Sequence, residues 1–186
     1  ASNAADLQTT LSQTIQEALK AVSINSRNYQ NWLALAQLYQ SLGGAGVQGA
    51  YDNAISAYQK AAAANPTNPL PLIGEAQVAL AQNNATSSIG FLTAALVLKP
   101  NLAAAYFMRS QVEGGQSNFT PAIQDAKTAV SLAQLDPLGW YNLGVILYSS
   151  GDYATAVLAL KQAVSLNNDY ANALFVLALA DDKVGD

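Results

Sequence analysis

The fold is decided by residues 140–163, which read WYNLGVILYSSGDYATAVLALKQA. Two small residues of this stretch belong to series that recur every 34 residues along the chain. The first series is Ala54, Ser88, Ala122 and Ala156, and the second is Ala61, Ala95, Ala129 and Ala163. The larger residues Leu72, Tyr106, Trp140 and Leu174 keep the same interval. A period of this length is typical of stacked helical units, each of which buries its apolar side only against its neighbours.

Apolar residues at helical spacing, with helix-breaking residues between them, predict ten helices. We expect them near residues 6–24, 29–42, 51–64, 69–82, 85–98, 103–115, 119–132, 137–150, 153–166 and 171–184. Asn68-Pro69 and Asp136-Pro137 each combine a capping side chain with a proline at the first helical position. Short turns favour antiparallel pairs, and the small residues of the first series would let the two helices of a pair pack closely.

Composition excludes several classes of function. The chain contains no cysteine and no histidine, which excludes thiol and imidazole chemistry and zinc sites built from those side chains. Charged residues make up only 11%, the net charge is −4, and Lys and Arg form no cluster, so we expect no nucleic-acid partner. No apolar run approaches the length of a membrane-spanning helix, so we expect no direct membrane insertion of this fragment. We expect no enzymatic activity, no metal and no cofactor.

Two stretches resemble the tetratricopeptide repeat (TPR). The first matches the packing positions of that family at Trp140, Leu143, Gly144, Leu147, Gly151, Tyr153, Ala156, Leu160 and Ala163. The second does so at Trp32, Leu35, Ala36, Tyr39, Ala54, Tyr58, Ala61 and Pro66. The resemblance implies an all-α, right-handed α-solenoid of antiparallel helix pairs, a TPR superhelix of about ten helices. It also implies a scaffold for protein binding, as in bacterial TPR-containing proteins.

The resemblance divides the chain into repeats. We expect one TPR domain over residues 6–186: a lone helix over 6–28, full repeats over 29–68, 69–102, 103–136 and 137–170, and a terminal helix over 171–186. Residues 1–5 look like a disordered cloning scar, and both ends look cut, since the first and last helices each lack the partner of their pair. A Gly-rich loop between Leu42 and Tyr51 contains a G-x-G-x-x-G string. We interpret it as a connection between helices, because no strand precedes it.

In this family the first helix of each pair lines the concave groove, and the resemblance therefore gives the candidate binding residues. They are Leu33, Gln37, Gln40, Ile73, Gln77, Phe107, Met108, Gln111, Tyr141, Asn142, Val145, Tyr148, Phe175, Val176 and Leu179. Gln37, Gln77 and Gln111 take equivalent positions and would form a row of amides that pairs with the backbone of an extended peptide. The apolar neighbours would supply pockets. The alternative is that these glutamines are only common polar helix formers.

Charged residues are few near these positions. The groove offers Arg109 and Asn142 but no lysine, so we expect an uncharged or apolar ligand rather than a partner's terminal carboxylate. Glu75 and Arg109 are equivalent residues of adjacent repeats, and we expect a structural ion pair between them. The acidic residues Asp181, Asp182 and Asp186 are interpreted as a solvated helix end rather than a calcium site.

Two kinds of function stay open. The first is a protein–protein interaction scaffold that binds an uncharged or apolar peptide segment or helix in the concave groove. The second is a structural or oligomerisation domain, such as a homodimer formed through the groove or end helices, and the positive mean hydropathy of +0.14 favours it. Residues 28–69 are also similar to TPR tails of bacterial membrane proteins of the O-antigen ligase type. Both the cytoplasm and an extracytoplasmic location therefore stay open.

Overall fold

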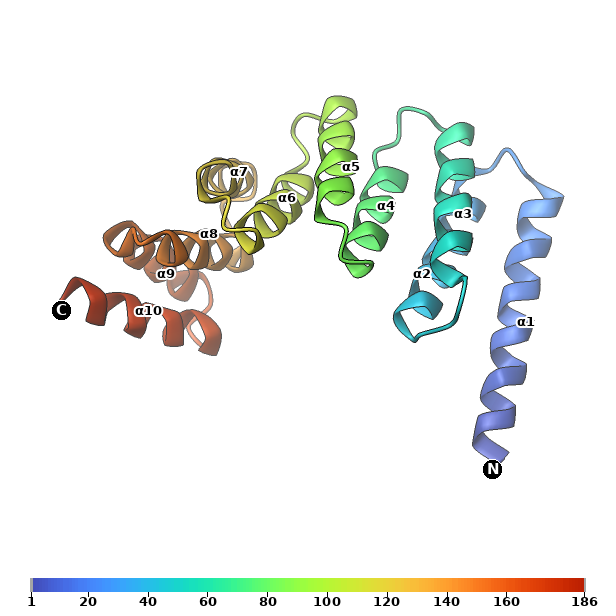
Figure 1. The fold of residues 1–186 in the computed structure, drawn as a ribbon, viewed down its shortest axis with the longest axis horizontal. Helices are drawn as coiled ribbons and strands as arrows, with labels where there is room; N and C mark the ends of the chain where they lie inside the picture. Colours follow the sequence, from blue (N-terminus) through green and yellow to red (C-terminus); the bar gives the residue numbers. More distant parts are fainter. Residues whose placement is uncertain (1, 186) are drawn as a thin grey trace. The chain divides into compact units, whose positions relative to one another are not determined.

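The computed structural model describes residues 2–185, and the side chains of residues 9–185. This part of the chain forms ten helices and no strand (Figure 1). The helices are α1 Ser2–Ile24, α2 Tyr29–Gly44, α3 Ala50–Ala64, α4 Leu70–Ala81, α5 Ala85–Leu98, α6 Ala103–Gly115, α7 Phe119–Leu132, α8 Pro137–Ser150, α9 Tyr153–Leu166 and α10 Ala171–Val184. The prediction of ten helices is confirmed, and α5 to α10 have the predicted bounds.

The first helix differs most from expectation. It begins at Ser2, so it includes residues 2–5, which we expected to be disordered. Two of these residues are alanines, the strongest helix formers, and they extend the helix toward the N-terminus. Ala1, also assigned to the scar, and Asp186, assigned to the acidic helix end, lie outside the described residues.

The helices divide between two compact units, residues 1–98 and residues 99–186. In the first unit α2 packs on α3 and α4 on α5, and α1 contacts α2. In the second unit α6 packs on α7 and α8 on α9, and α10 contacts both α9 and α8. The four pairs make an all-α solenoid of helix pairs, in which each repeat is buried by its neighbours and there is no single core. The predicted repeat boundaries and the single domain over residues 6–186 stay predictions.

Small residues hold the helices of each pair close together. Ala54, Ser88, Ala122 and Ala156 each have 0% of their surface exposed, which confirms their predicted burial. Among the glycines of the second unit, Gly144 of α8 has the least space for a side chain. A Cβ atom there would lie 2.5 Å from Cγ of Leu160 in α9. Such a distance is far inside van der Waals contact. The missing side chain therefore sets the spacing between α8 and α9.

The two predicted helix-start signals behave differently. Asp136 caps α8 as expected, with its carboxylate accepting the backbone N–H of Leu138 at 3.0 Å and Pro137 as the first helical residue. At the other signal the helix begins one residue later, at Leu70, so Pro69 occupies the capping position itself. The Asn68 side chain still accepts the N–H of Leu70 at 3.0 Å. The local chemistry is therefore as predicted, and only the bound of the helix was wrong.

Substituting Gly144→Ala tests this packing. The added methyl group would meet Leu160, which is 0% exposed and has no room to move away. We expect a loss of about 1–3 kcal/mol in the free energy of unfolding, measured by urea denaturation. Gly115→Ala in the same unit is the control, because a Cβ at Gly115 meets no atom within 4 Å. The control should change stability by less than about 1 kcal/mol, and an equal loss in both variants would contradict the packing argument.

Candidate functional site

The candidate binding residues of the second unit come from three helices that contact one another in succession. Helix α6 contacts α8, and α8 contacts α10. Among the predicted residues of these helices, Phe175 is 65% exposed, and Gln111 and Leu179 are also exposed. The half-buried ones are Phe107, Met108, Tyr141, Val145, Tyr148 and Val176. The second unit therefore presents aromatic, aliphatic and amide groups from its first helices.

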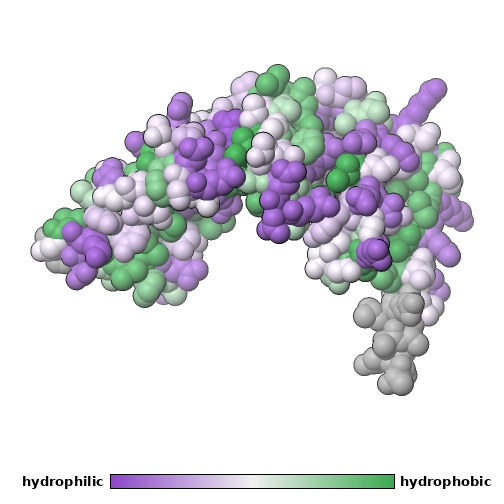
Figure 2. Space-filling view, in the orientation of Figure 1, coloured by the Kyte–Doolittle hydropathy of each residue, from purple (hydrophilic) through white to green (hydrophobic). Residues whose placement is uncertain are grey.

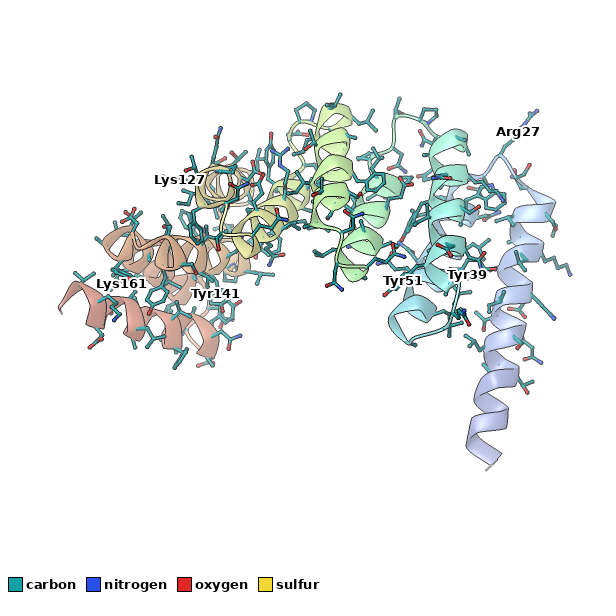
Figure 3. The ribbon with its side chains drawn as sticks, in the orientation of Figure 1. Arg27, Tyr39, Tyr51, Lys127, Tyr141 and Lys161 are labelled. Atoms are coloured by element: carbon teal, nitrogen blue, oxygen red, sulfur yellow. The ribbon has the colours of Figure 1, made fainter. Side chains whose placement is uncertain are left out.

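Ring contacts fix two of these aromatic side chains. Tyr141 is labelled in Figure 3, and its ring lies 5.0 Å, centroid to centroid, from that of Tyr170, the residue just before α10. The Tyr148 ring lies 5.3 Å from that of Tyr153 at the start of α9. Both pairs are tilted, an arrangement that aromatic rings favour over a face-to-face stack. The two tyrosines are therefore held in place before any ligand arrives.

Three of the predicted residues line one hollow between α6 and α8. The hollow has a volume of about 330 Å³ and includes Gln111, Asn142 and Val145 in its wall. Asn142 is only 7% exposed, and its Nδ2 donates to the Ser110 hydroxyl at 2.8 Å. That hydroxyl donates in turn to the carbonyl oxygen of Phe107 at 2.7 Å. The Asn142 amide thus joins α6 to α8, a packing role that the prediction of a groove residue did not include.

The first unit carries the remaining predicted residues on α2 and α4. Gln37 and Gln77 are exposed, whereas Leu33, Gln40 and Ile73 are half-buried. The amides pair across the two helices: Nε2 of Gln40 donates to Oε1 of Gln77 at 3.1 Å. The hydroxyl of the buried Tyr58 also donates to Gln40. The amide contact in this unit therefore joins Gln77 to Gln40, a residue outside the predicted row of equivalent glutamines.

Burial keeps the Tyr58 hydroxyl in its donor form. Desolvation, together with the nearby Glu75 carboxylate, raises the pKa of Tyr58 to about 12. The Tyr58 ring is 1% exposed, and a Cβ at Gly74 of α4 would lie 2.1 Å from it. Gly74 therefore makes room for the ring beneath the surface that Gln40 and Gln77 form.

The first helices of the pairs contain very little charge. Helices α2 and α8 carry no charged residue, α4 carries only Glu75, and α6 carries Arg109 and Glu113. Glu75 and Glu113 are 5% and 8% exposed, and Arg109 is half-buried. Burial raises the pKa of Glu75, and a hydrogen bond to Gln59 opposes the shift. These surfaces therefore offer a ligand few charged groups.

Arg109 forms an ion pair that the sequence analysis missed. Its Nε lies 2.6 Å from Oδ2 of Asp125 in α7, and its Nη2 lies 2.9 Å from Oδ1. The signal was a carboxylate among the alanines on the apolar side of α7, between Ala122 and Ala129. Glu75 and Arg109 belong to different units, so the ion pair expected between them stays a prediction.

Glu113 lies beside this pair with one carboxylate oxygen unsatisfied. Its Oε2 is buried and has no hydrogen-bond partner in the described part of the chain. Burial raises the pKa of Glu113, the Asp125 carboxylate raises it further, and the Arg109 guanidinium lowers it. The folded protein therefore disfavours the ionised form of Glu113.

Substituting Asp125→Ala tests the buried pair. The guanidinium of Arg109 would lose both hydrogen bonds while only 18% of its side chain reaches water. We expect a loss of about 2–4 kcal/mol in the free energy of unfolding. The control is Lys161→Ala, since Lys161 lies 3.8 Å from Asp181 and is 59% exposed. Removing that surface pair should cost less than about 1 kcal/mol, and equal losses would rule out a special role for Asp125.

Substituting Glu113→Gln tests the raised pKa. Because the folded state holds the Glu113 proton more tightly than the unfolded chain, the wild type loses stability as the pH rises through the raised pKa. Glutamine is neutral throughout, so the variant should gain stability relative to wild type between about pH 4 and pH 7. Urea unfolding at several pH values measures the difference, with the exposed Asp52→Asn as control. A variant that loses stability at pH 7 would mean that Arg109 outweighs burial.

The described residues contain no group of three or more His, Cys, Asp or Glu side chains placed to hold a metal ion. None of the helices described for this chain has the length and apolar character needed to cross a membrane.

Comparison with solved structures places the fold among TPR proteins. MamA is 25% identical over 74% of this chain and 81% of its own, with a TM-score of 0.68. YrrB, described as a TPR protein with an unusual peptide-binding site, is 18% identical over 93% of this chain and 86% of its own, with a TM-score of 0.68. The C-terminal part of a TPR repeat-containing protein from Cytophaga hutchinsonii is 16% identical over 96% of this chain and 68% of its own, with a TM-score of 0.78.

Family models agree with the structural likeness. No curated protein matches the chain. Two models, each described as tetratricopeptide repeat, match residues 48–110 and 137–170, which together make up just over half of the sequence. The matched segments include Ala54, Ser88 and Ala156 of the first small-residue series and the Trp140 motif from which the repeat was first inferred. The chain belongs to the tetratricopeptide repeat family.

Proposed function

We propose that this protein is an interaction scaffold that binds an uncharged or apolar peptide segment, or a helix, along the first helices of its repeats. The observation that carries the proposal is the largely apolar and aromatic set of side chains that α6, α8 and α10 contribute to the second unit, with α8 free of charged residues. Helix α8 contains no charged residue at all, and Phe175 of α10 is 65% exposed. A ligand with apolar side chains would remove this surface from water, which is the main source of affinity in such contacts.

The polar groups on these helices suit a peptide backbone. The exposed amide of Gln111 can donate and accept, so it can pair with the backbone without selecting a side chain. The guanidinium of Arg109 is already bound to Asp125 and is not free to hold a carboxylate. These features favour a ligand with few charges. The description of YrrB as a TPR protein with a peptide-binding site supports the same class of partner.

Self-association is the second candidate, and the exposed face of α10 favours it. The large apolar residues of α10 exposed by 39% or more are Leu174, Phe175, Leu179 and Val184. Figure 2 shows hydrophobic residues at the surface over this helix. Exposed apolar patches on soluble proteins commonly mark contact sites, and a second copy could cover this one.

Binding and self-association can be separated with one variant. Phe175→Ala should leave folding almost unchanged, because the ring is 65% exposed. We expect peptides selected on the wild type from a display library to bind the variant about tenfold more weakly, measured by isothermal titration. The variant Gln124→Ala, on the exposed side of α7, is the control and should bind as the wild type does.

Light scattering coupled to size-exclusion chromatography completes the test. If the wild type is a monomer and Phe175→Ala weakens peptide binding, the scaffold proposal holds. If the wild type is a dimer that Phe175→Ala dissociates, α10 serves self-association instead. Peptides that bind wild type and variant equally would mean that this surface is not the binding site.

A further inference from the structure

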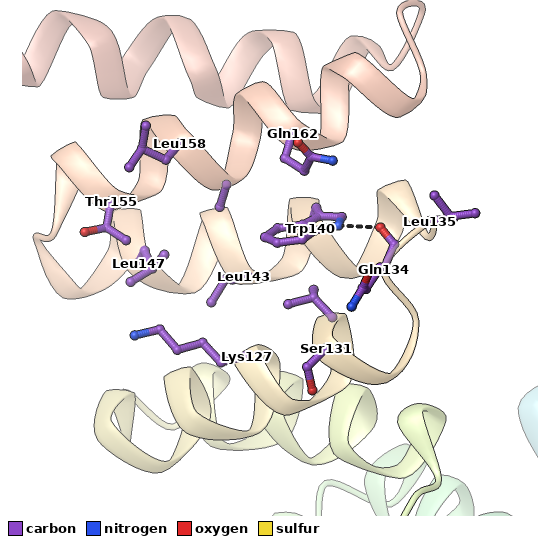
Figure 4. A pocket seen from close by; sticks show the side chains of 12 residues that line it. Lys127, Ser131, Gln134, Leu135, Trp140, Leu143, Leu147, Thr155, Leu158 and Gln162 are labelled. Carbon is purple, nitrogen blue, oxygen red and sulfur yellow. Dashed lines mark hydrogen bonds between the residues drawn. The ribbon is translucent and has the colours of Figure 1, made fainter.

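A second hollow in the second unit lies on a different side of α8 (Figure 4). Its volume is about 690 Å³, and its walls come from α7, α8 and α9. The apolar lining consists mainly of Val130, Leu135, Trp140, Leu143, Leu147 and Leu158. On α8 the lining residues Trp140, Leu143 and Leu147 follow one helical stripe, whereas Tyr141, Val145 and Tyr148 follow another. The hollow is therefore distinct from the surface assigned to peptide binding above.

The walls of this hollow combine a hydrogen-bonded indole ring and buried leucines with leucines that are exposed to water. Nε1 of Trp140 donates to the carbonyl oxygen of Gln134 at 2.8 Å, which fixes the plane of the indole ring (Figure 4). Leu143 and Leu147 are 4% and 1% exposed and form the floor. Leu158 and Leu135 are 69% and 83% exposed. Two leucines thus stay in water beside a preformed apolar hollow.

The first unit offers an internal comparison. Trp32 makes the same bond, from Nε1 to the carbonyl oxygen of Ser26 at 2.8 Å, and lines a hollow of about 570 Å³. That hollow also contains Arg27 and Lys60, and the Lys60 ammonium lies 4.7 Å from the centroid of the Trp32 ring. The positions equivalent to Arg27 and Lys60 in the last repeat are Leu135 and Gln162.

Comparing the two hollows shows which of their residues the packing of the repeat requires and which it does not. The tryptophan and its hydrogen bond occur in both hollows, so they belong to the architecture of the repeat. Arg27 and Lys60 line only the hollow beside Trp32. The packing of the repeat therefore requires neither these cations nor the leucine and glutamine at the equivalent positions. With a leucine and an amide in place of these two cations, the hollow beside Trp140 is lined mainly by apolar side chains, which suits an apolar ligand.

One charged residue lines the hollow beside Trp140. Lys127 of α7 lies toward the end opposite Leu135 (Figure 4). Its side chain is exposed, and within the described part of the chain it forms no ion pair. A ligand that fills the hollow therefore meets apolar groups along most of its length and a cation at one end. Charge complementarity calls for a carboxylate at that end.

The elements around the hollow also select the shape of the ligand. Helices α7 and α9 form its two sides, and their backbone groups are already paired within each helix. An extended strand would leave its own N–H and C=O groups facing apolar side chains, whereas a helix satisfies these groups internally. A helix also packs its side chains between those of two neighbouring helices.

We propose that this hollow binds an amphipathic helix of a partner protein, with apolar side chains against Trp140 and Leu158 and a carboxylate at Lys127. The site goes beyond the peptide-binding surface of α6, α8 and α10 and does not depend on it. It would let the repeat contact two partners at once, one on each side of α8.

The test uses the intact 186-residue chain and a display library of helical 18-residue peptides (an experimental choice of about five turns). Selection on the wild type is followed by counter-selection on Leu158→Glu, which should fold normally because Leu158 is 69% exposed. Isothermal titration then measures each recovered peptide. We expect binding about tenfold weaker to Leu158→Glu and to Leu135→Glu. Lys127→Glu should also weaken binding of acidic peptides, and added salt should weaken wild-type binding in the same way.

Phe175→Ala is the matched control, since it alters the other surface of the second unit. Peptides of the proposed site should bind it as they bind the wild type, so failure of one site is distinguishable from failure of the other. Circular dichroism of every variant checks that folding is intact. The proposal is overturned if no recovered peptide distinguishes Leu158→Glu from wild type. It is also overturned if the wild type is a dimer that Leu158→Glu dissociates, because a second copy would then occupy the hollow.

Discussion

The whole structure depends on how closely the two helices of a pair approach each other. Ala54, Ala122 and Ala156 are fully buried where the pairs meet, and Gly144 admits the Leu160 side chain directly against the backbone of α8. A repeat has little apolar surface of its own to bury, so it relies on this close contact and on the next repeat. The small residues are therefore fixed by packing, and they carry no information about the ligand.

The same constraint limits where charge can be placed. The first helices of the pairs are covered on two sides by their neighbours, and a charge on a covered side must be neutralised locally. The Arg109–Asp125 pair does this between α6 and α7, with two hydrogen bonds of 2.6 and 2.9 Å. Burial and the Asp125 carboxylate raise the pKa of Glu113, next to the pair, and one of its carboxylate oxygens has no hydrogen-bond partner in the described part of the chain. The exposed surface of the first helices therefore consists mainly of amide and apolar side chains.

Sequence alone predicted the repeat well and individual contacts poorly, for a physical reason. Helix bounds follow from periodicity, caps and breakers, which are local, and α5 to α10 began and ended as expected. The partner of Arg109 was missed because it is set by the packing of α7 on α6, which no spacing within one helix encodes. Asn142 lines the hollow between α6 and α8, and its expected role toward a ligand stays a prediction; its hydrogen bond to Ser110 was missed because it depends on the packing of α8 on α6. The hollow beside Trp140 was missed because three separate helices create it.

The repeats can be compared with one another, because each one packs its helices in the same way but with different side chains. Residues that differ without a packing reason can then be related to function. Trp32 and Trp140 pack in the same way, and Nε1 of each ring donates a hydrogen bond to the carbonyl oxygen six residues earlier. Around them the side chains diverge: Lys60 lies over the Trp32 ring, whereas the hollow that Trp140 borders carries its one charged lining residue, Lys127, toward the end opposite Leu135. Packing explains why both tryptophans donate this hydrogen bond. It does not explain why the charged and apolar residues around the two rings differ. At exposed positions, equivalent repeats can carry different residues without any effect on packing. Such differences are where this sequence can encode a preference for one binding partner.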